Sequence, residues 1–185
     1  MEVYRRKNRE PITYNANGDI ESIYYFDQKP VHTSIGDIPA ELVTFYENGN
    51  VERVFPRYGA LSGFWSEEDE YSLAEEMNIR IGKFDLNLKP QCIRFYPEGE
   101  VWSITLWRFD EVGIKTPYGT VKTRKGFSFY RDGSLESIEP VFDTRIDTGH
   151  GIVRLYDPDA FPLNADNNSL VFNEDGTIRS MKTIG

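Results

Sequence analysis

Apolar and polar residues alternate along most of this chain, and glycine interrupts the alternation at regular intervals. In one pattern an aromatic residue stands four positions before a glycine and an aliphatic residue stands two positions after it. This pattern occurs five times: ITYNANGDIESI (12–23), VTFYENGNVERV (43–54), IRFYPEGEVWSI (93–104), FSFYRDGSLESI (127–138) and LVFNEDGTIRSM (170–181). Alternation with a period of two is typical of half-buried β-strands, so each copy predicts two strands joined by a tight turn.

The residues around each glycine predict the kind of turn. Asn, Asp or Glu comes directly before the glycine, at Gly18, Gly49, Gly99, Gly133 and Gly176. These residues suit a type I turn followed by glycine in the left-handed region, which is the three-residue hairpin loop with a bulge. The aromatic residue, the aliphatic residue two after the glycine and the apolar residue six before it should then share one face, the core face.

The apolar residues five positions after each glycine form a separate set. Alternation along the second strand predicts that they lie on the face opposite the core aromatic residues. Curling strands or an insertion would then have to cover them: Ile23, Val54, Ile104, Ile138 and Met181.

A second motif, apolar-x-Thr-x-x-Gly-x-apolar, alternates with the first. It occurs as VHTSIGDI (31–38), IKTPYGTV (114–121) and IDTGHGIV (146–153), with a weaker copy that lacks the threonine at IRIGKF (79–84). Gly18 and Gly49 lie 31 positions apart, and Gly99 and Gly133, which are 34 positions apart, keep close to this rhythm. Two kinds of hairpin are therefore predicted to alternate along nearly the whole chain.

Two insertions break the rhythm, at about 57–78 and about 156–168. The first contains a helix candidate in which Ser66 is the N-cap and acidic residues follow it at the positive end of the helix dipole. Tyr71, Ala74 and Met77 are predicted to face inward from this segment.

The fold class predicted from these patterns is all-β. We expect a single domain over residues 1–185, built as an elongated array of antiparallel hairpins that form a mostly single, twisted sheet, with one short helix in an insertion. A two-sheet sandwich is the alternative architecture.

The five blocks resemble MORN-type repeats, in particular a divergent bacterial variant whose core reads tyrosine-tyrosine-x-x-glycine followed by an aliphatic strand. This chain departs from them in its longer period and in lacking the glycine-x-glycine pair that usually follows the second strand. The resemblance implies an antiparallel hairpin array. It also implies an antitoxin-like role, because some proteins of that kind carry this label. The alternation with a second hairpin motif resembles an uncharacterised bacterial family.

Composition narrows the function classes. The net charge of −9 argues against general binding to nucleic acid or to anionic membranes. A single cysteine excludes an intrachain disulfide framework and thiolate-rich zinc sites. No apolar run is long enough for a transmembrane helix, and the N-terminus does not read as a secretory signal, so we expect a cytoplasmic location. The basic residues Arg5, Arg6, Lys7 and Arg9 are interpreted as a frayed, solvated terminus.

Residues that could carry chemistry are few. His32 is expected to make a cross-strand hydrogen bond, His150 to lie exposed in a turn, and Cys92 to be a packed thiol. The oxygen-rich segment around Asp157, Asp159 and Asp166 is a weak calcium candidate that does not fit an EF-hand loop. The sequence therefore predicts no cofactor and no catalytic residue.

Aromatic residues are the remaining indication of a site. Tyr46, Tyr96 and Tyr130 recur three positions before the glycine, where packing on the next hairpin is favoured over a binding surface. Tyr58, Phe64, Trp65 and Tyr71 lie outside the repeat pattern, in the 57–78 insertion, and are the predicted binding residues, with Trp65 as the main anchor. Plugging the sheet is the competing role for Trp65.

The function expected from the sequence is a non-enzymatic β-repeat interaction module with an unknown protein partner. A carboxylate-dependent hydrolase or carbohydrate-active protein is one alternative, and an antitoxin-like protein is another. The hydrolase would require two carboxylates that face each other in a cleft, one of them with a raised pKa. The oligomeric state is left open.

Overall fold

A computed structural model describes residues 5, 10–59, 61–155, 165 and 168–183 of the chain. It contains one helix, α2 (Glu67–Ser72), among these residues, and the other elements are strands. The strands are β1 (Ile12–Tyr14), β2 (Ile20–Thr33), β3 (Gly36–Phe45), β4 (Val51–Phe55), β5 (Met77–Ile81), β6 (Phe84–Leu88), β7 (Pro90–Phe95), β8 (Val101–Leu106), β9 (Val112–Thr116), β10 (Gly119–Phe129), β11 (Leu135–Pro140), β12 (Thr144–Asp147), β13 (Ile152–Leu155), β14 (Leu170–Phe172) and β15 (Ile178–Met181).

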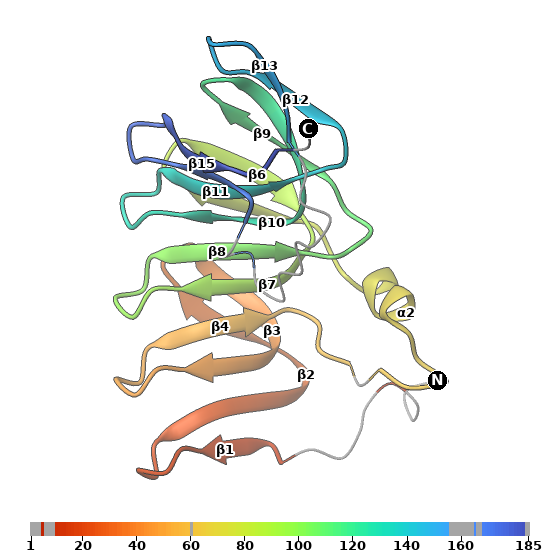
Figure 1. Ribbon diagram of the computed structural model, residues 1–185. Coiled ribbons are helices and arrows are strands. Elements are labelled where there is room, and N and C mark those ends of the chain that lie inside the picture. The colour runs from red at the N-terminus through yellow and green to blue at the C-terminus, as the bar shows by residue number, and fades with distance from the viewer. Residues whose placement is uncertain (1–4, 6–9, 60, 156–164, 166–167, 184–185) are drawn as a thin grey trace.

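Most strands form one antiparallel sheet in the order β1-β2-β3-β4-β7-β8-β10-β11-β14-β15, with β9 paired to β10. Each copy of the first motif is one hairpin of this sheet, and we call these the sheet hairpins, first to fifth along the chain: β1–β2, β3–β4, β7–β8, β10–β11 and β14–β15. Their turns follow one another along one side of the molecule, at the left of Figure 1. The predicted all-β hairpin array with a short helix is confirmed.

The predicted turn is also confirmed. In the second sheet hairpin the backbone N–H of Gly49 donates to the carbonyl of Tyr46 over 2.9 Å, and Gly49 has a φ of +82°. Phe45 then pairs with Val51, as expected, but Thr44 pairs with Arg53, which leaves one extra residue on the second strand. Type I turn, left-handed glycine and bulge therefore occur together.

The bulge corrects the prediction for the residues five positions after the glycine. Because it inserts one residue, Val54 pairs with Val43 and lies on the same face as Phe45. Val54, Ile104 and Ile138 are 0% exposed in the core. The prediction that this set faces away from the aromatic residues was wrong, because it counted alternation straight through the bulge.

The opposite face carries a row of mostly polar residues that crosses the whole sheet. The row is formed by one residue from each strand, in register: Thr13, Ser22, Thr44, Arg53, Arg94, Ser103, Ser128, Ser137, Val171 and Ser180. Near its middle the Ser128 and Ser137 hydroxyl oxygens are 2.6 Å apart, and the Asn168 side-chain amide donates to Ser137. We call this surface the polar-row face.

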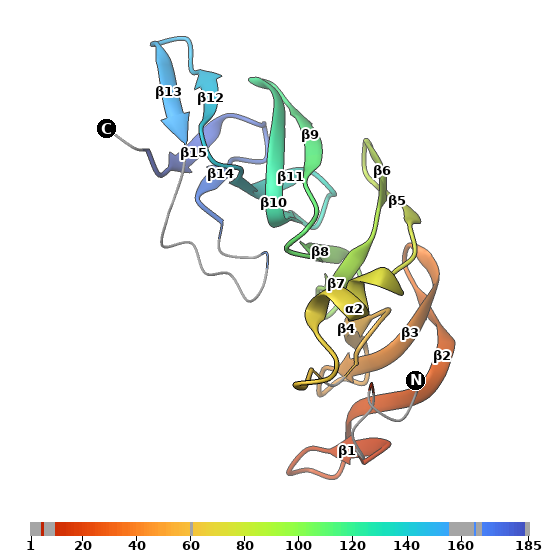
Figure 2. The same ribbon diagram turned by 90° about the vertical axis from the view of Figure 1, so that its right-hand side faces the viewer.

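Copies of the second motif form a second layer over the apolar face. We call them the cover hairpins, first to fourth: the outer halves of β2 and β3, then β5–β6, β9 with the start of β10, and β12–β13. They stand in a row in Figure 2, and their apolar side chains, such as Ile79, Leu86 and Ile114, belong to the same core cluster as the sheet aromatics.

The second and third cover hairpins each reach over a sheet hairpin that begins later in the chain. The second, at Gly82, touches the turn at Gly133 in the fourth sheet hairpin, where a Cβ on Gly82 would come within 2.8 Å of the Gly133 carbonyl oxygen. The third packs Tyr118 against Phe172 of the fifth sheet hairpin, with ring centroids 6.4 Å apart. In both cases the cover hairpin that follows sheet hairpin n lies over sheet hairpin n + 2.

The tyrosines three positions before the glycine connect neighbouring sheet hairpins. The Tyr46 hydroxyl donates to the carbonyl of Phe95 over 2.7 Å, the Tyr96 hydroxyl to Phe129 over 3.0 Å, and the Tyr130 hydroxyl to Phe172 over 2.6 Å. Burial raises the pKa of Tyr46, and it raises the pKa of Tyr96 to about 12. Packing of these tyrosines between hairpins, which the sequence favoured, is what the structure shows.

The helix begins where the sequence places it. Ser66 is the N-cap, its hydroxyl accepts from the Asp69 backbone N–H, and the Asp69 carboxylate accepts from the Ser66 backbone N–H, which completes a capping box. The helix ends at Ser72, so of the three residues predicted to face inward, Ala74 is buried beyond the helix and Met77 starts β5. No helix within the described residues is long and apolar enough to cross a membrane.

Candidate functional site

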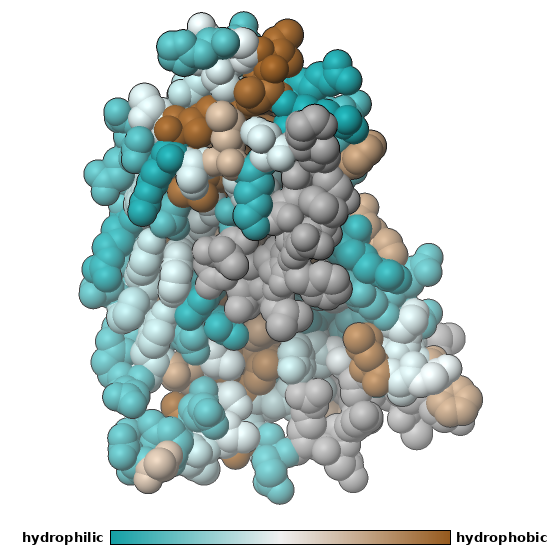
Figure 3. Space-filling model, in the orientation of Figure 1, coloured by the Kyte–Doolittle hydropathy of each residue, from teal (hydrophilic) through white to brown (hydrophobic). Residues whose placement is uncertain are grey.

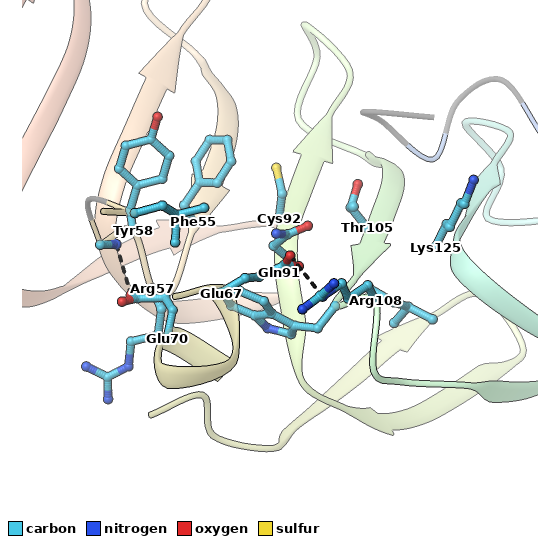
Figure 4. A pocket seen from close by; sticks show the side chains of 14 residues that line it. Phe55, Arg57, Tyr58, Glu67, Glu70, Gln91, Cys92, Thr105, Arg108 and Lys125 are labelled. Atoms are coloured by element: carbon cyan, nitrogen blue, oxygen red, sulfur yellow. Dashed lines mark hydrogen bonds and ion pairs between the residues drawn. The ribbon is translucent and has the colours of Figure 1, made fainter. Parts of the chain in front are cut away.

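A cavity of about 640 Å³ lies between the first insertion and the sheet. The side chains in Figure 4 come from β4, the insertion, β7, the end of β8 and the start of the fourth sheet hairpin. The lining residues are Phe55, Arg57, Tyr58, Gly59, Leu61, Glu67, Glu70, Gln91, Cys92, Thr105, Leu106, Trp107, Arg108 and Lys125. Most of this surface is apolar, which is usual for a site that binds a small molecule or an apolar side chain.

The sheet side of the cavity belongs to the polar-row face. Cys92 pairs with Thr105 one step beyond the core pair Ile93 and Ile104, so alternation places Cys92 and Thr105 on the opposite face from the core. Trp107, two residues after Thr105, is only 3% exposed. The polar row thus gives way to apolar side chains at this end of the strands, which creates a surface that the insertion partly covers.

The insertion is attached to the sheet through buried charges. Arg5 donates to Glu41 of β3 over 2.8 Å and, from its Nε atom, to Glu70 of α2 over 3.0 Å. Glu41 also accepts from the backbone N–H of Tyr58, and Glu70 from that of Gly59. Burial by itself lowers the pKa of Arg5, but the hydrogen bonds and charges of the two carboxylates outweigh it and raise that pKa.

This network corrects the interpretation of the basic N-terminal residues. Arg5 is 5% exposed, so it is not part of a solvated terminus. Its partners are 36 and 65 positions away in the sequence, and no local pattern indicates such a pairing. Arg6, Lys7 and Arg9 lie outside the described residues.

Of the predicted binding residues, Tyr58 lines the cavity and contacts Phe55 edge to face, with ring centroids 5.1 Å apart. Trp65 is half-buried beside the cavity, and its indole N–H donates to Glu70 over 2.7 Å. Phe64 is 81% exposed. Trp65 is therefore neither a plug of the sheet nor a fully exposed anchor.

Tyr71, the fourth predicted residue, fixes the helix to the sheet. Its ring packs edge to face on Trp107 at 6.0 Å, and its hydroxyl donates to Asp110 over 2.6 Å. That hydrogen bond is the main cause of the raised pKa of Tyr71, with burial second. Tyr71 supports the cavity from behind rather than lining it.

Sequence reasoning missed the residues on the sheet side of the cavity. Cys92 was predicted to be a packed thiol, which its 8% exposure supports, but its place beside a cavity was not predicted. Thr105, Leu106 and Trp107 follow the third copy of the first motif and have no duty in the repeat. Leu106 and Trp107 are apolar residues that the repeat pattern does not explain, so they indicated a possible binding site as strongly as the aromatic residues of the insertion did.

The histidines lie elsewhere. His32 hydrogen-bonds through Nδ1 to Asp37 across the first cover hairpin over 2.9 Å, which is the expected cross-strand role, and His150 is exposed in its turn, as expected. Neither histidine lines the cavity beside Cys92. Among the described residues no group of three or more His, Cys, Asp and Glu could hold a metal ion. The calcium candidates Asp157, Asp159 and Asp166 lie outside the described residues.

The two carboxylates of the cavity are engaged in ion pairs. Glu67 lies 3.2 Å from Arg108, and Glu70 is bound by Arg5 (Figure 4 shows the first of these pairs as a dashed line). A raised carboxyl pKa occurs at Glu139, mainly because it is buried, but Glu139 does not line the cavity.

Comparisons with known proteins give no relative from which the role of this cavity could be inferred. No protein-family model, no curated protein and no solved structure matches the chain.

Proposed function

We propose that this protein is a non-enzymatic interaction module that binds an apolar segment of a protein partner in the cavity under the first insertion. The observation that carries the proposal is the cavity itself. Its volume is in the usual range of binding pockets, its lining is mainly apolar, and the carboxylates Glu67 and Glu70 are already paired with arginines. An uncharged, apolar guest would not have to separate either pair.

Exposed apolar residues next to the cavity support the same function. Leu61 lines it and is 55% exposed, and Phe64, three residues further along the insertion, is 81% exposed. Large exposed apolar side chains beside a cavity are the usual composition of a protein-binding surface. Tyr58, Trp65 and Tyr71 then act in different ways: Tyr58 lines the site, while Trp65 and Tyr71 hold the insertion in place through Glu70 and Asp110.

Selection from a peptide-display library tests this function although the natural partner is unidentified. Peptides selected on the wild-type protein should carry aliphatic or aromatic anchors. They should bind the Leu61→Asp variant at least about tenfold more weakly, which corresponds to about 1.4 kcal/mol. Leu73→Asp is the matched control, because Leu73 lies in the same insertion, is 37% exposed and does not line the cavity.

The proposal fails if the selected peptides bind the wild type and the Leu61→Asp variant equally well, or if no peptide is enriched. No separate observation favours the hydrolase, since both carboxylates that line the cavity are engaged in ion pairs with arginines. The antitoxin-like role rests on the sequence resemblance alone. In that role the protein partner bound by this chain would be a toxin.

A further inference from the structure

Each end of the sheet has an edge strand with one unpaired side. Among the described strands, β1 and β15 each pair on one side only, and two residues beyond β15 Thr183 forms an isolated bridge with Leu155 of β13. Ile12 in β1 is 38% exposed and Met181 in β15 is 37% exposed, whereas the residues in the same apolar row inside the sheet, such as Val54 and Ile104, are 0% exposed. Exposed edges of this kind are where another strand can add.

Neighbouring sheet hairpins always join in the same register. The residue five after one glycine pairs with the residue six before the next, as in Val54 with Ile93 and Ile104 with Phe127. The residue four after the glycine pairs with the one five before the next, as in Ser103 with Ser128. The other two junctions follow the same rule: Ile23 with Val43, Ser22 with Thr44, Ile138 with Leu170 and Ser137 with Val171.

The rule predicts how β15 would meet β1 of a second copy. Met181 would pair with Ile12 and Ser180 with Thr13, so that apolar meets apolar and hydroxyl meets hydroxyl. The Pro11 carbonyl accepts from Tyr24 and the Lys182 N–H donates to Ser169, both inside the sheet. Because backbone groups alternate in direction along a strand, those of Ile12 and Met181 point to the open edges, where they could bond each other.

Among the described residues, the layer of cover hairpins is shifted along the sheet, so that it extends beyond the sheet at one end and leaves the sheet uncovered at the other. The fourth cover hairpin, β12–β13, follows the fourth sheet hairpin and would lie over a sixth, but the described residues form only five. Near its tip Ile152 is 74% exposed, and hydrophobic side chains appear at the surface at this end of the molecule in Figure 3. At the other end the first sheet hairpin has no described cover hairpin on it, and Tyr14 is 59% exposed where Phe129 is 0% exposed in the fourth.

Exposed residues of opposite charge stand on or beside the two edge strands. On or next to β15 stand Arg179 and Lys182, both exposed. Around β1 stand Glu10 and Glu21, both exposed, and Glu21 accepts a hydrogen bond from Thr13 in the edge strand. In the predicted register Arg179 would lie two strands from Glu21, or about 10 Å between strand axes, a distance that two long side chains can bridge.

We propose that this protein assembles head to tail with further copies of itself, β15 of one copy pairing with β1 of the next. The β12–β13 hairpin of the first copy then lies over the first sheet hairpin of the second, with Ile152 near Tyr14. The two surfaces differ, so the contact is heterologous and each added copy leaves both kinds of end open. Chains of copies therefore form at high protein concentration.

Mixing two single variants tests the proposal. Ile12→Glu disables the β1 edge and Met181→Glu disables the β15 edge, and both side chains are partly exposed, so folding is retained. Light scattering should show growing oligomers for the wild type, a monomer for each variant alone, and a dimer when the variants are mixed, because one usable edge of each kind remains. Leu73→Glu, matched in exposure but remote from both edges, should assemble as the wild type does.

Other outcomes would overturn the proposal. These are a wild type that stays monomeric at every concentration, assembly that survives both substitutions, or assembly abolished by only one of them, which indicates two-fold pairing of like edges. Cysteine pairs test the register. The Thr13→Cys, Ser180→Cys double variant should give a disulfide-linked ladder on oxidation, while Thr13→Cys with Lys182→Cys should not; equal ladders would contradict the proposed register.

Discussion

The first and fourth sheet hairpins have the same local structure in very different surroundings. Both turn through a left-handed glycine, Gly18 with φ +89° and Gly133 with φ +81°. In both, the aromatic residue pairs with the aliphatic residue two after the glycine. Yet Tyr14 is 59% exposed in the first hairpin and Phe129 is 0% exposed in the fourth.

A cover hairpin makes the difference. Phe129 meets Phe84 of β6 edge to face, with ring centroids 5.5 Å apart, and no described cover hairpin lies over Tyr14. The motif therefore determines turn and register through local interactions. Whether its aromatic residue becomes core depends on a hairpin about two repeats earlier in the chain. Equivalent positions in this repeat are not energetically equivalent.

The largest expected effect is the contrast between these two aromatic residues. Phe129→Ala should lower the free energy of unfolding by about 3–5 kcal/mol, because it removes a buried ring and leaves a cavity. Tyr14→Ala should change it by less than about 0.5 kcal/mol, as expected for an exposed side chain. Urea denaturation of both variants below the concentration at which copies associate measures the two values. Similar losses at the two positions would show that the first hairpin is covered after all.

The sequence predicted what local interactions decide. Turn, pairing and helix cap each depend on residues within a few positions of one another, as in the Ser66 capping box. The face of Val54 was predicted wrongly because a single bulged residue reverses the count beyond it. The second layer was not predicted, because it joins residues as distant as Gly82 and Gly133, and periodicity does not show which hairpin covers which.

The candidate site could be predicted only in part. Aromatic residues that the repeat pattern does not explain indicated a site in the insertion, and one of them, Tyr58, does line the cavity. The role of Trp65 was not foreseen, because it depends on Glu70, whose burial in turn depends on Arg5. A buried ion pair between residues 65 positions apart leaves no periodic trace in a sequence.

Gly82 and Gly18 show how much the contact between a cover hairpin and a sheet turn contributes to stability. Gly82→Ala should destabilise the protein by about 1–2 kcal/mol through its left-handed backbone and by about 1–3 kcal/mol more through crowding, because the new Cβ meets the Gly133 carbonyl oxygen at 2.8 Å. Gly18→Ala, with open space around its Cβ, should show the backbone contribution alone. Thermal or urea unfolding measures both. Equal losses would mean that the second cover hairpin does not rest on the fourth sheet hairpin.

In the insertion, Trp65 is held by a hydrogen bond whereas Phe64 is exposed, so the two residues should differ in their contribution to stability. Trp65→Phe keeps a ring but removes the indole N–H that donates to the Glu70 carboxylate, so it should cost about 1.5–3 kcal/mol, the usual range for a hydrogen bond to a charged group. Phe64→Ala, at 81% exposure, should cost less than about 0.5 kcal/mol. Urea unfolding measures the two. A Trp65→Phe variant as stable as the wild type would remove this residue from the support of the insertion.

The smallest effect concerns the tyrosines that join one sheet hairpin to the next. The first sheet hairpin has Asn15 at this position, and its amide oxygen accepts from the backbone N–H groups of Asn17 and Asp19 in its own turn. Tyr96 instead donates from the third sheet hairpin to Phe129 in the fourth. Tyr96→Phe should therefore cost about 0.5–1.5 kcal/mol at neutral pH, and Tyr14→Phe, whose ring is exposed, should cost almost nothing.

The contribution of the Tyr96 hydroxyl to stability should depend on pH in the alkaline range, whereas a loss of packing alone would not. Burial raises the pKa of Tyr96 to about 12, above the value of about 10 for an unfolded tyrosine. Between these two values the folded chain keeps a proton that the unfolded chain releases, so the contribution of Tyr96 to stability is complete below pH 10 and declines as the pH rises toward 12. Urea unfolding at neutral and alkaline pH should show the difference between wild type and Tyr96→Phe shrinking as the pH rises. A difference that stays constant or widens would mean that the Tyr96 hydroxyl is not held between the two hairpins.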